Sequence, residues 1–572
     1  MKLLSLAEPG MNRSRIRAAC SRQDPFRSGS ATTLLALCLF LAACSNQENG
    51  AIGARAIQVG TELASEQVLN RHLGADPRSI DPSLATEVVG AMILDDIGEG
   101  LVTLSADGRT VPGVAASWET SADGKTWTFH LRDDARWSNG EAVTAEDFVY
   151  SWRRLVDPAT GAEYAQYLAP VENGIETATG KMPPDRLGVE ARGPRTLVVR
   201  LHTPTSYFLS MVGNMWLFPI YRPAVEQWGD SWTQPGHMIS NGAFTLAERV
   251  NNGHITIVRN PHYWGASQVR LTKVVYTIIS DSNSSTDQYL AGSLDVTDRI
   301  PPSRKDLLQK ALGSQVVYAP YFGTAMFGYN FAKPPFAGNP KLCLALNIAL
   351  DRDILAKYVM RETVLPAYNI MPPLAGYDPA VPTWANFSPD ERHALARKLY
   401  REAGYSDSNP LEVVLTYATG GPETRRFMEA MSAMWQMNLG AKVQIYNMEW
   451  KVFLQARQLK QPTLYWNAWI GDYPDPFTFM QLFQTGFDMN QGSYSNPRFD
   501  ALLERAGNLK DDAARYDLFH QAEAILNEDA PLLPVYYYQS AHLIKPYVKG
   551  WESSVTDRHL SRYLYVMSYQ ED

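Results

Sequence analysis

Asp472 and Asp475 lie close together in a proline-rich loop, and their spacing is the one in this sequence that suggests acid-base chemistry. Two carboxyl groups can hydrolyse a glycosidic bond when one protonates the leaving group and the other attacks it or activates water. Aromatic residues also surround the loop, as in many sugar-binding sites. An exported hydrolase is therefore one hypothesis, although two acids in one loop support it only weakly.

Other catalytic motifs are absent from the sequence. It has no Gly-x-Ser-x-Gly elbow, no His-Glu-x-x-His helix and no Cys-x-x-Cys pair. Gly124, Lys125 and Thr126 resemble the end of a phosphate-binding loop, but Glu119 stands where the first glycine is required, so a hairpin turn explains them better. The ten histidines are scattered along the chain. We therefore expect no catalytic residue, no metal site and no cofactor, and we expect a binding protein rather than an enzyme.

The overall charge excludes another class of partner. The 572 residues carry a formal net charge of -8, with a pI near 5.8. Nucleic-acid-binding domains normally present a basic face, so nucleic acid is not an expected partner. Aromatic residues make up 11% of the chain, which is rich for a soluble protein and points to a surface built from rings.

The elements that must position these residues alternate between strands and helices. Asp-Gly or Asn-Gly turns at 107–108, 123–124 and 139–140 indicate hairpins. Strands are expected at 126–132, 196–201, 254–259, 274–279 and 326–331. Helices are expected at 145–156, 340–359, 389–404, 424–439 and 511–527. The pattern predicts a mixed α/β fold without internal repeats.

The N-terminal residues predict export. Five arginines between positions 13 and 27 precede an apolar run at 31–43, which is shorter than the roughly 20 residues that span a bilayer as a helix. The run ends in Leu-Ala-Ala-Cys, which resembles a bacterial lipobox. We expect residues 1–43 to be a lipoprotein signal peptide, Cys44 to carry lipid, and 44–56 to form a lipidated tether. Of the other cysteines only Cys343 would remain, as a buried and unreactive thiol.

Ten segments in a fixed order follow the signal and extend over nearly the whole remaining chain. They are DPRSIDP at 76–82, EGL at 99–101, VPGVAASW at 111–118, WTFHL at 127–131, RWSNGEAVTAEDFVYSW at 136–152, NGAF at 241–244, LDRDI at 350–354, LPAY at 365–368, AGY at 403–405 and PVYYY at 534–538. In these segments the chain resembles the oligopeptide-binding lipoproteins and periplasmic proteins that supply ABC importers.

The resemblance implies a two-lobed periplasmic binding protein clamp, type II-like, which closes on its ligand by hinge motion. Lobe I would combine residues 57–100, 221–323 and 540–572. Residues 101–220 would form an additional hairpin-rich domain, and 324–539 would form lobe II. The implied partners are a short peptide and the permease and ATPase subunits of an ABC transporter. We expect a monomer, held in the periplasm on a membrane by its lipid.

The same resemblance supplies a binding site. In the family, an aspartate in a Trp-x-x-Asp-Tyr context binds the α-ammonium group of the peptide, and here that residue is Asp472, preceded by Gly471. Aromatic residues line the cleft in the family, although core packing is the alternative for any single ring. The matching positions are Trp450, Trp469, Tyr164, Tyr321 and Tyr538.

The sequence departs from its relatives where they bind the peptide carboxylate. The matching positions are Trp466, Met360 and Glu423, and none of them is cationic. Another cation, from Arg299, Arg361, Arg425 or Arg426, a wet C-terminus, or a different ligand would be required. Murein peptides or another small solute are therefore alternatives, as is an adhesion or structural lipoprotein with this fold. A pair of bridged cysteines in the relatives is also replaced, by Gly323 and Ile470.

Overall fold

A computed structural model describes residues 57–205, 207–374, 376–509 and 511–571. The chain divides into two units, 1–52 and 53–572, and the described residues all lie in the second. The predicted signal peptide, the tether and Cys44 are outside the described residues. Within the described ranges, no helix has both the length and the apolar character needed to cross a membrane.

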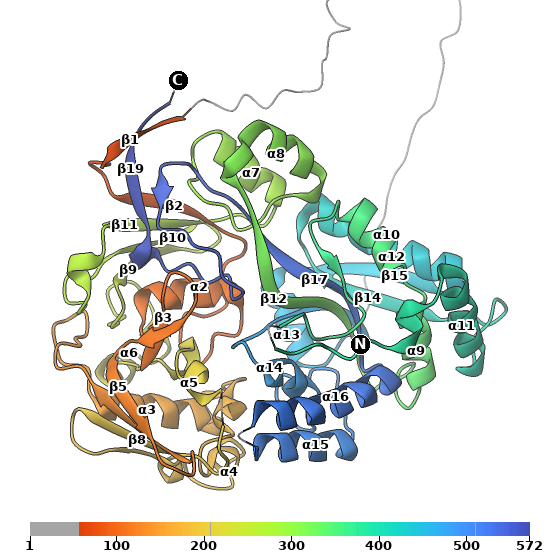
Figure 1. The fold of residues 1–572 in the computed structure, drawn as a ribbon, viewed down its shortest axis with the longest axis horizontal. Helices are drawn as coiled ribbons and strands as arrows, with labels where there is room; N and C mark the ends of the chain where they lie inside the picture. The colour runs from red at the N-terminus through yellow and green to blue at the C-terminus, as the bar shows by residue number, and fades with distance from the viewer. Residues whose placement is uncertain (1–56, 206, 375, 510, 572) are drawn as a thin grey trace, which may run out of the picture. The chain divides into compact units, whose positions relative to one another are not determined.

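Two sheets include strands from the start of the described chain, and one of them also includes strands from its end. Strand β2 pairs in parallel with β11, which continues through β10 to β9. In the second sheet, β1 pairs with β19, so the red and blue ends of the described chain lie side by side in Figure 1. The strands are β1 (Ile57–Leu63), β2 (Val68–Leu73), β9 (Phe244–Val250), β10 (His254–Arg259), β11 (Lys273–Ile278), β18 (Val548–Lys549) and β19 (Tyr565–Glu571).

Hairpins dominate the segment between them. The predicted turns at Gly108, Gly124 and Gly140 are confirmed, each glycine having a positive φ of 75 to 89° that favours residues without a Cβ. The predicted helix at 145–156 is also confirmed as α3, with Thr144 in a capping box. The strands are β3 (Val102–Leu104), β4 (Thr110–Pro112), β5 (Ala115–Thr120), β6 (Thr126–Leu131), β7 (Val189–Ala191) and β8 (Thr196–Arg200).

A six-stranded sheet forms the centre of the remaining chain, in the order β13-β17-β12-β16-β14-β15. Strands β12 and β17 are long and antiparallel, with Val316 opposite Leu543 at one end and Gly328 opposite Leu532 at the other. The strands are β12 (Val316–Tyr329), β13 (Leu365–Pro366), β14 (Glu412–Ala418), β15 (Lys442–Met448), β16 (Leu464–Ile470) and β17 (Leu532–Leu543). Each of these two long strands crosses a predicted boundary between the lobes, at 323–324 in β12 and at 539–540 in β17. The division into lobes stays a prediction.

The helices cover these sheets (Figure 1). Sequence analysis located α11, α12 and α16 to within a few residues, and the structure shows that Ser388 caps α11 in a capping box. The helices are α2 (Val88–Ile97), α3 (Ala145–Val156), α4 (Gly174–Ala178), α5 (Phe208–Met211), α6 (Arg222–Trp228), α7 (Ser282–Leu290), α8 (Lys305–Leu312), α9 (Pro340–Ile348), α10 (Arg352–Ile354), α11 (Pro389–Glu402), α12 (Gly421–Leu439), α13 (Trp450–Gln458), α14 (Phe477–Met480), α15 (Pro497–Gly507) and α16 (Asp512–Asp529).

The predicted single helix at 340–359 is wrong. Helix α9 ends at Ile348, and the chain resumes as the short α10, followed by one π-helical turn. The buried guanidinium of Arg352 donates to the carbonyl oxygens of Asn347 and Leu350, at 2.9 and 3.3 Å. These bonds satisfy one carbonyl group in the last turn of α9 and one just beyond it. The helix can therefore end at Ile348 without leaving these groups unpaired.

Candidate ligand-binding site

The loop after β16 holds Asp472 in a fixed backbone position. The amide of the preceding Gly471 donates to the carbonyl of Phe322 at 2.8 Å, and a Cβ at Gly471 would lie 2.3 Å from the Phe322 ring. The Asp472 amide donates to the Thr478 hydroxyl at 3.0 Å, and the Asn214 side chain donates to the Asp472 carbonyl at 2.8 Å. Glycine at 471 therefore permits a close approach that presents Asp472 at the end of the strand.

The Asp472 carboxyl group is buried and incompletely paired. Its Oδ2 atom accepts no hydrogen bond from any described residue. Burial raises the pKa of Asp472 well above its usual range, although the Thr478 hydroxyl and the Arg558 guanidinium both lower it. Arg558 is itself bound to Asp95, at 2.7 Å from Nε. A carboxyl group in this state gains a partner when a cation binds beside it.

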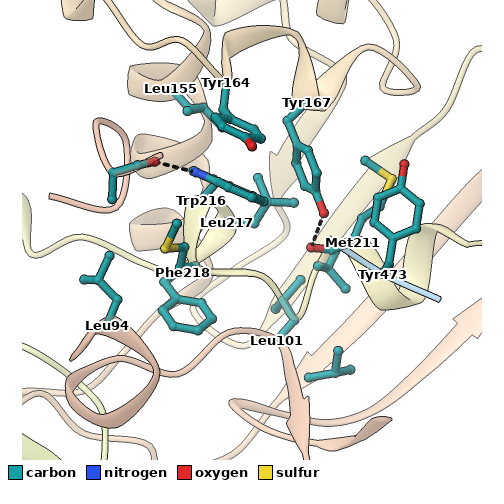
Figure 2. Close-up of a cluster of buried hydrophobic side chains, with 14 of the residues drawn as sticks. Leu94, Leu101, Leu155, Tyr164, Tyr167, Met211, Trp216, Leu217, Phe218 and Tyr473 are labelled. Carbon is teal, nitrogen blue, oxygen red and sulfur yellow. Dashed lines mark hydrogen bonds between the residues drawn. The ribbon is translucent and has the colours of Figure 1, made fainter. Parts of the chain in front are cut away.

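Several aromatic rings lie in one buried cluster, in which Figure 2 shows Tyr164, Tyr167, Trp216 and Tyr473, the neighbour of Asp472 in the chain. Tyr164 is buried and stacks on Trp216 with ring centroids 3.8 Å apart, and Tyr167 packs against the same indole at 4.9 Å. Burial, followed by the negative charge of Asp472, raises the pKa of both tyrosines, which places their hydroxyl groups near the carboxylate. Tyr473 completes the group by stacking on Tyr207 at 4.9 Å.

Tyr321 and Tyr538 form a second group at the same end of the sheet. Their ring centroids are 6.1 Å apart, and a Cβ at Gly323 would lie 3.2 Å from the Tyr538 ring. Gly323 is paired with Ile470, two residues before Asp472. Burial raises the pKa of Tyr538 and the positive charge of Arg299 lowers it, so this arginine lies near the ring. The second group therefore combines aromatic rings with a cation.

The three predicted tryptophans have different environments. Trp469 is 7% exposed and donates to the Thr478 hydroxyl at 3.3 Å, so it supports the Asp472 loop. Trp450 begins α13, and its buried indole N–H has no acceptor among the described residues. Trp466 packs against Phe327, Phe427 and Tyr536, with ring centroids 4.9, 5.4 and 6.0 Å away. Trp450 thus retains a donor for a ligand, whereas Trp466 presents an apolar face.

The arginines proposed to replace the lost cations differ in position. Arg425 and Arg426 are mostly exposed and pair with acids of their own helix, Glu429 at 2.8 Å and Glu423 at 3.5 Å. The side chain of Arg299 is 64% exposed, and its nearest acid is Asp298 at 3.9 Å. Of these three, only Arg299 lies beside the cleft tyrosines.

Asp475 has a structural environment. Both its carboxylate oxygens accept from Nη2 of Arg515 at 3.0 Å, and both side chains are buried. The charge of Asp475 is therefore matched inside the protein. This arrangement gives no support to a catalytic pair with Asp472.

Sequence reasoning missed several residues that hold the site together. Thr478 lies within the same loop as Asp472 and carried a local signal. Asn214 and the ion pair between Lys451 and Asp76, at 3.0 Å, join segments hundreds of positions apart and carried none. A separate cavity of about 480 Å³, lined by Glu163, Phe487 and others, includes none of the predicted ligand residues, and we assign the site by the Asp472 geometry instead.

Comparison with known proteins gives one consistent family. Residues 109–491 match the bacterial extracellular solute-binding proteins, family 5 Middle. The chain is 36% identical to the periplasmic murein peptide-binding protein MppA of Escherichia coli over 520 residues, covering 90% of this chain and 96% of MppA. It is also 36% identical to the periplasmic oligopeptide-binding protein OppA of the same organism over 518 residues, covering 90% and 95%.

Solved structures agree with the sequence matches. The structure of the E. coli murein tripeptide binding protein MppA superposes with a TM-score of 0.87, covering 89% of this chain and all of that one. The unliganded open form of MppA gives 0.64 at the same 36% identity and with 89% and 99% coverage. Haemophilus influenzae OppA in complex with the peptide RPPGFSPFR gives 0.86 at 34% identity, covering 89% and 100%. The arrangement of residues 57–571 is thus closer to the first MppA structure than to the open form.

Proposed function

Because this chain belongs to the bacterial extracellular solute-binding proteins of family 5, we propose that it captures short peptides beside Asp472 and delivers them to an ABC importer. The permease and the ATPase would be separate chains. The protein would act in the periplasm as a monomer without enzymatic activity, held on a membrane by lipid on Cys44. Support comes from its relatives, MppA and OppA, which are named as periplasmic murein peptide-binding and oligopeptide-binding proteins.

The observation that carries the proposal is the buried, unpaired Oδ2 atom of Asp472. A peptide α-ammonium group would supply the missing donor and charge. An importer receptor that accepts many sequences must recognise what peptides share, which is the backbone and the charged ends. Pairing along strand edges satisfies the backbone. Rings such as Trp450 and Tyr538 would contact varied side chains over a large area at low entropic cost.

The test compares Asp472→Asn with the unaltered protein, in calorimetric titrations with one tripeptide and its N-acetylated form. We expect the substitution to weaken binding of the free tripeptide by about 3 kcal/mol, or a hundredfold, because it leaves a buried ammonium unpaired. Acetylation of the peptide should weaken binding to the unaltered protein similarly. Asp488→Asn, an exposed acid in a nearby loop, is the matched control and should bind as before. Equal affinity for the free and acetylated peptides would refute amine capture.

Murein peptides are a second candidate ligand, favoured by the surroundings of Trp466. This indole lies among Phe327, Phe427 and Tyr536, where the resemblance places a cation for the carboxylate of an ordinary peptide. A titration of a tripeptide of L-residues against the murein tripeptide separates the two candidates. Tighter binding of the murein tripeptide by tenfold or more would assign the protein to cell-wall peptides.

A further inference from the structure

A cluster of metal-ligating side chains lies outside the predicted ligand site. His542 belongs to β17, while Asp557 and His559 belong to the loop that precedes β19. Oδ1 of Asp557 lies 2.9 Å from Nε2 of His542 and 2.8 Å from Nε2 of His559. One ligand atom from each residue falls within 4.8 Å of the others. This cluster is not evident from local sequence patterns, because its histidines come from a strand and a separate loop.

The hydrogen bond between His542 and Thr297 determines which ring nitrogen of His542 carries hydrogen. Nδ1 lies 2.8 Å from the carbonyl oxygen of Thr297, which can only accept, so Nδ1 carries its hydrogen. In the neutral ring, Nε2 would then present a lone pair to the Asp557 carboxylate, and the two would repel each other. A metal ion bound to Nε2 would remove this repulsion, as would a proton shared between the two groups.

The remaining members are held by packing and by backbone geometry. The ring of His559 stacks on Trp551 with centroids 3.7 Å apart. Asp557 has a φ of 51°, a left-handed conformation that is unfavourable for most residues with a Cβ and that turns its carboxylate between the two rings. The side chains of His542, Asp557 and His559 are 6, 14 and 3% exposed, so the narrow access is at Asp557.

The charges around the cluster are nearly balanced. Asp298 lies near His542 and is paired with His72, while Arg299 is 3.9 Å from Asp298. Arg71 donates to the carbonyl of His559 at 2.9 Å. A divalent ion would add positive charge beside two acids, Asp557 and Asp298.

We propose that Nε2 of His542, Nε2 of His559 and the carboxylate of Asp557 bind a divalent transition-metal ion of the zinc class. Imidazole nitrogens and a carboxylate oxygen are ligands that Zn²⁺, Co²⁺ and Ni²⁺ accept, and three protein ligands leave one position open. Metal bonds of about 2.0 to 2.1 Å require ligand atoms about 3.3 Å apart, so Asp557 would retreat by roughly half an ångström. The bond from His542 to Thr297 is the outer contact that orients a metal-bound histidine.

Such an ion would fasten the loop around Asp557 to β17. This loop also contains Arg558, which binds Asp95 and is a positive charge near Asp472. The amide of Phe322, next to Tyr321 in β12, donates to the carbonyl of Val555 in the same loop at 2.8 Å. The metal would thus stabilise one wall of the predicted ligand site. This role is independent of which ligand the protein carries.

The test uses tag-free protein treated with a chelator and then titrated with Zn²⁺, with Mg²⁺ as the control ion. We expect one Zn²⁺ ion per chain and a rise in melting temperature of several degrees. Co²⁺ should give ligand-field absorption that Zn²⁺ removes. His559→Gln and Asp557→Asn should each lose both the binding and the shift in melting temperature. His130→Gln, a surface histidine beside Glu119, should retain them.

The Co²⁺ spectrum keeps the proposal testable if a variant does not fold, because it uses the unaltered chain. Absence of stoichiometric Zn²⁺ binding and of a Co²⁺ spectrum would overturn the proposal and leave a proton-bridged cluster. Retention of Zn²⁺ binding in folded His559→Gln and Asp557→Asn would overturn it equally, because the ion would then lie elsewhere.

Discussion

Two acids three positions apart in one loop have different surroundings. Asp475 is matched by Arg515, whereas Asp472 retains an unpaired, buried oxygen. The sequence places both in the same proline-rich stretch and cannot separate them. The difference between them arises from Arg515, which belongs to α16 and contacts Asp475 only in the folded chain.

Ligand binding should depend on pH through Asp472. Its carboxyl group has a raised pKa in the ligand-free protein, and an ammonium ligand favours the ionised form. Affinity for a peptide with a free amine is therefore expected to fall as the pH drops through the raised pKa. Below that pKa the Asp472 carboxyl group of the ligand-free protein is protonated, and it must release this proton when the ammonium group binds. Titration in buffers of different ionisation enthalpy measures the proton released on binding. In Asp472→Asn the release should vanish, and an unchanged release would assign it to another group.

Glu523 should give stability a pH dependence of its own. Burial raises its pKa to about 7, although hydrogen bonds from the Ala380 amide and the Asn369 side chain lower it. Since the unfolded pKa is near 4.5, the folded state binds the proton more tightly. This contribution is fully present below the unfolded pKa and is lost as the pH rises through about 7.

The expected size of the Glu523 contribution is about 3 kcal/mol in the free energy of unfolding. Urea unfolding of the unaltered protein and of Glu523→Gln, at several pH values between about 5 and about 8, measures it. The unaltered protein should gain stability relative to the variant as the pH falls. Parallel curves for the two proteins would contradict the prediction.

At the scale of elements, local signals located several helices and turns but not the end of α9, and the pairing of distant strands was not predicted. Helix α11 was located because Ser388, Pro389 and Glu391 form a start that neighbours alone determine. The central sheet was not predicted, because β12 pairs with β16 and β17 across more than a hundred residues. The aromatic positions of the site came from family resemblance, whereas Asn214 required the folded chain.

The pairing of β12 with β16 allows a direct test of register. Gly323 and Ile470 are directly opposite, and opposed residues of antiparallel strands have Cα atoms about 4.5 to 5.5 Å apart, within the range of a disulfide. The double substitution Gly323→Cys with Ile470→Cys is therefore expected to form a bridge and to add about 2 to 4 kcal/mol to stability. Thiol titration and mass spectrometry detect the bridge, with Gly323→Ser and Ile470→Ser as the unbridged control. Two persistent free thiols under oxidising conditions would show that the register is wrong.

At the scale of the whole molecule, chain segments far apart in sequence converge on the ligand site. Asp76 and Lys451 form an ion pair, and Asn214 bonds to the loop of Asp472. The TM-scores of 0.87 and 0.64 against two MppA structures distinguish the present arrangement from an open one.

The molecule is therefore expected to open and close around its ligand. Small-angle X-ray scattering should show a smaller radius of gyration with saturating tripeptide than without it. Lys451→Met, which breaks the ion pair with Asp76, should shift the ligand-free protein further towards the open state. An identical radius with and without bound peptide would exclude hinge closure.

Cys343 has a consequence for how the protein is made. It is the only cysteine in the described part of the chain, and burial raises the pKa of its thiol. A single buried thiol cannot form an internal bridge, so folding of residues 57–571 does not depend on an oxidising enzyme. The binding domain should therefore mature in a reducing cytosol as completely as in an oxidising compartment, and its production does not require the cell's thiol-oxidation machinery.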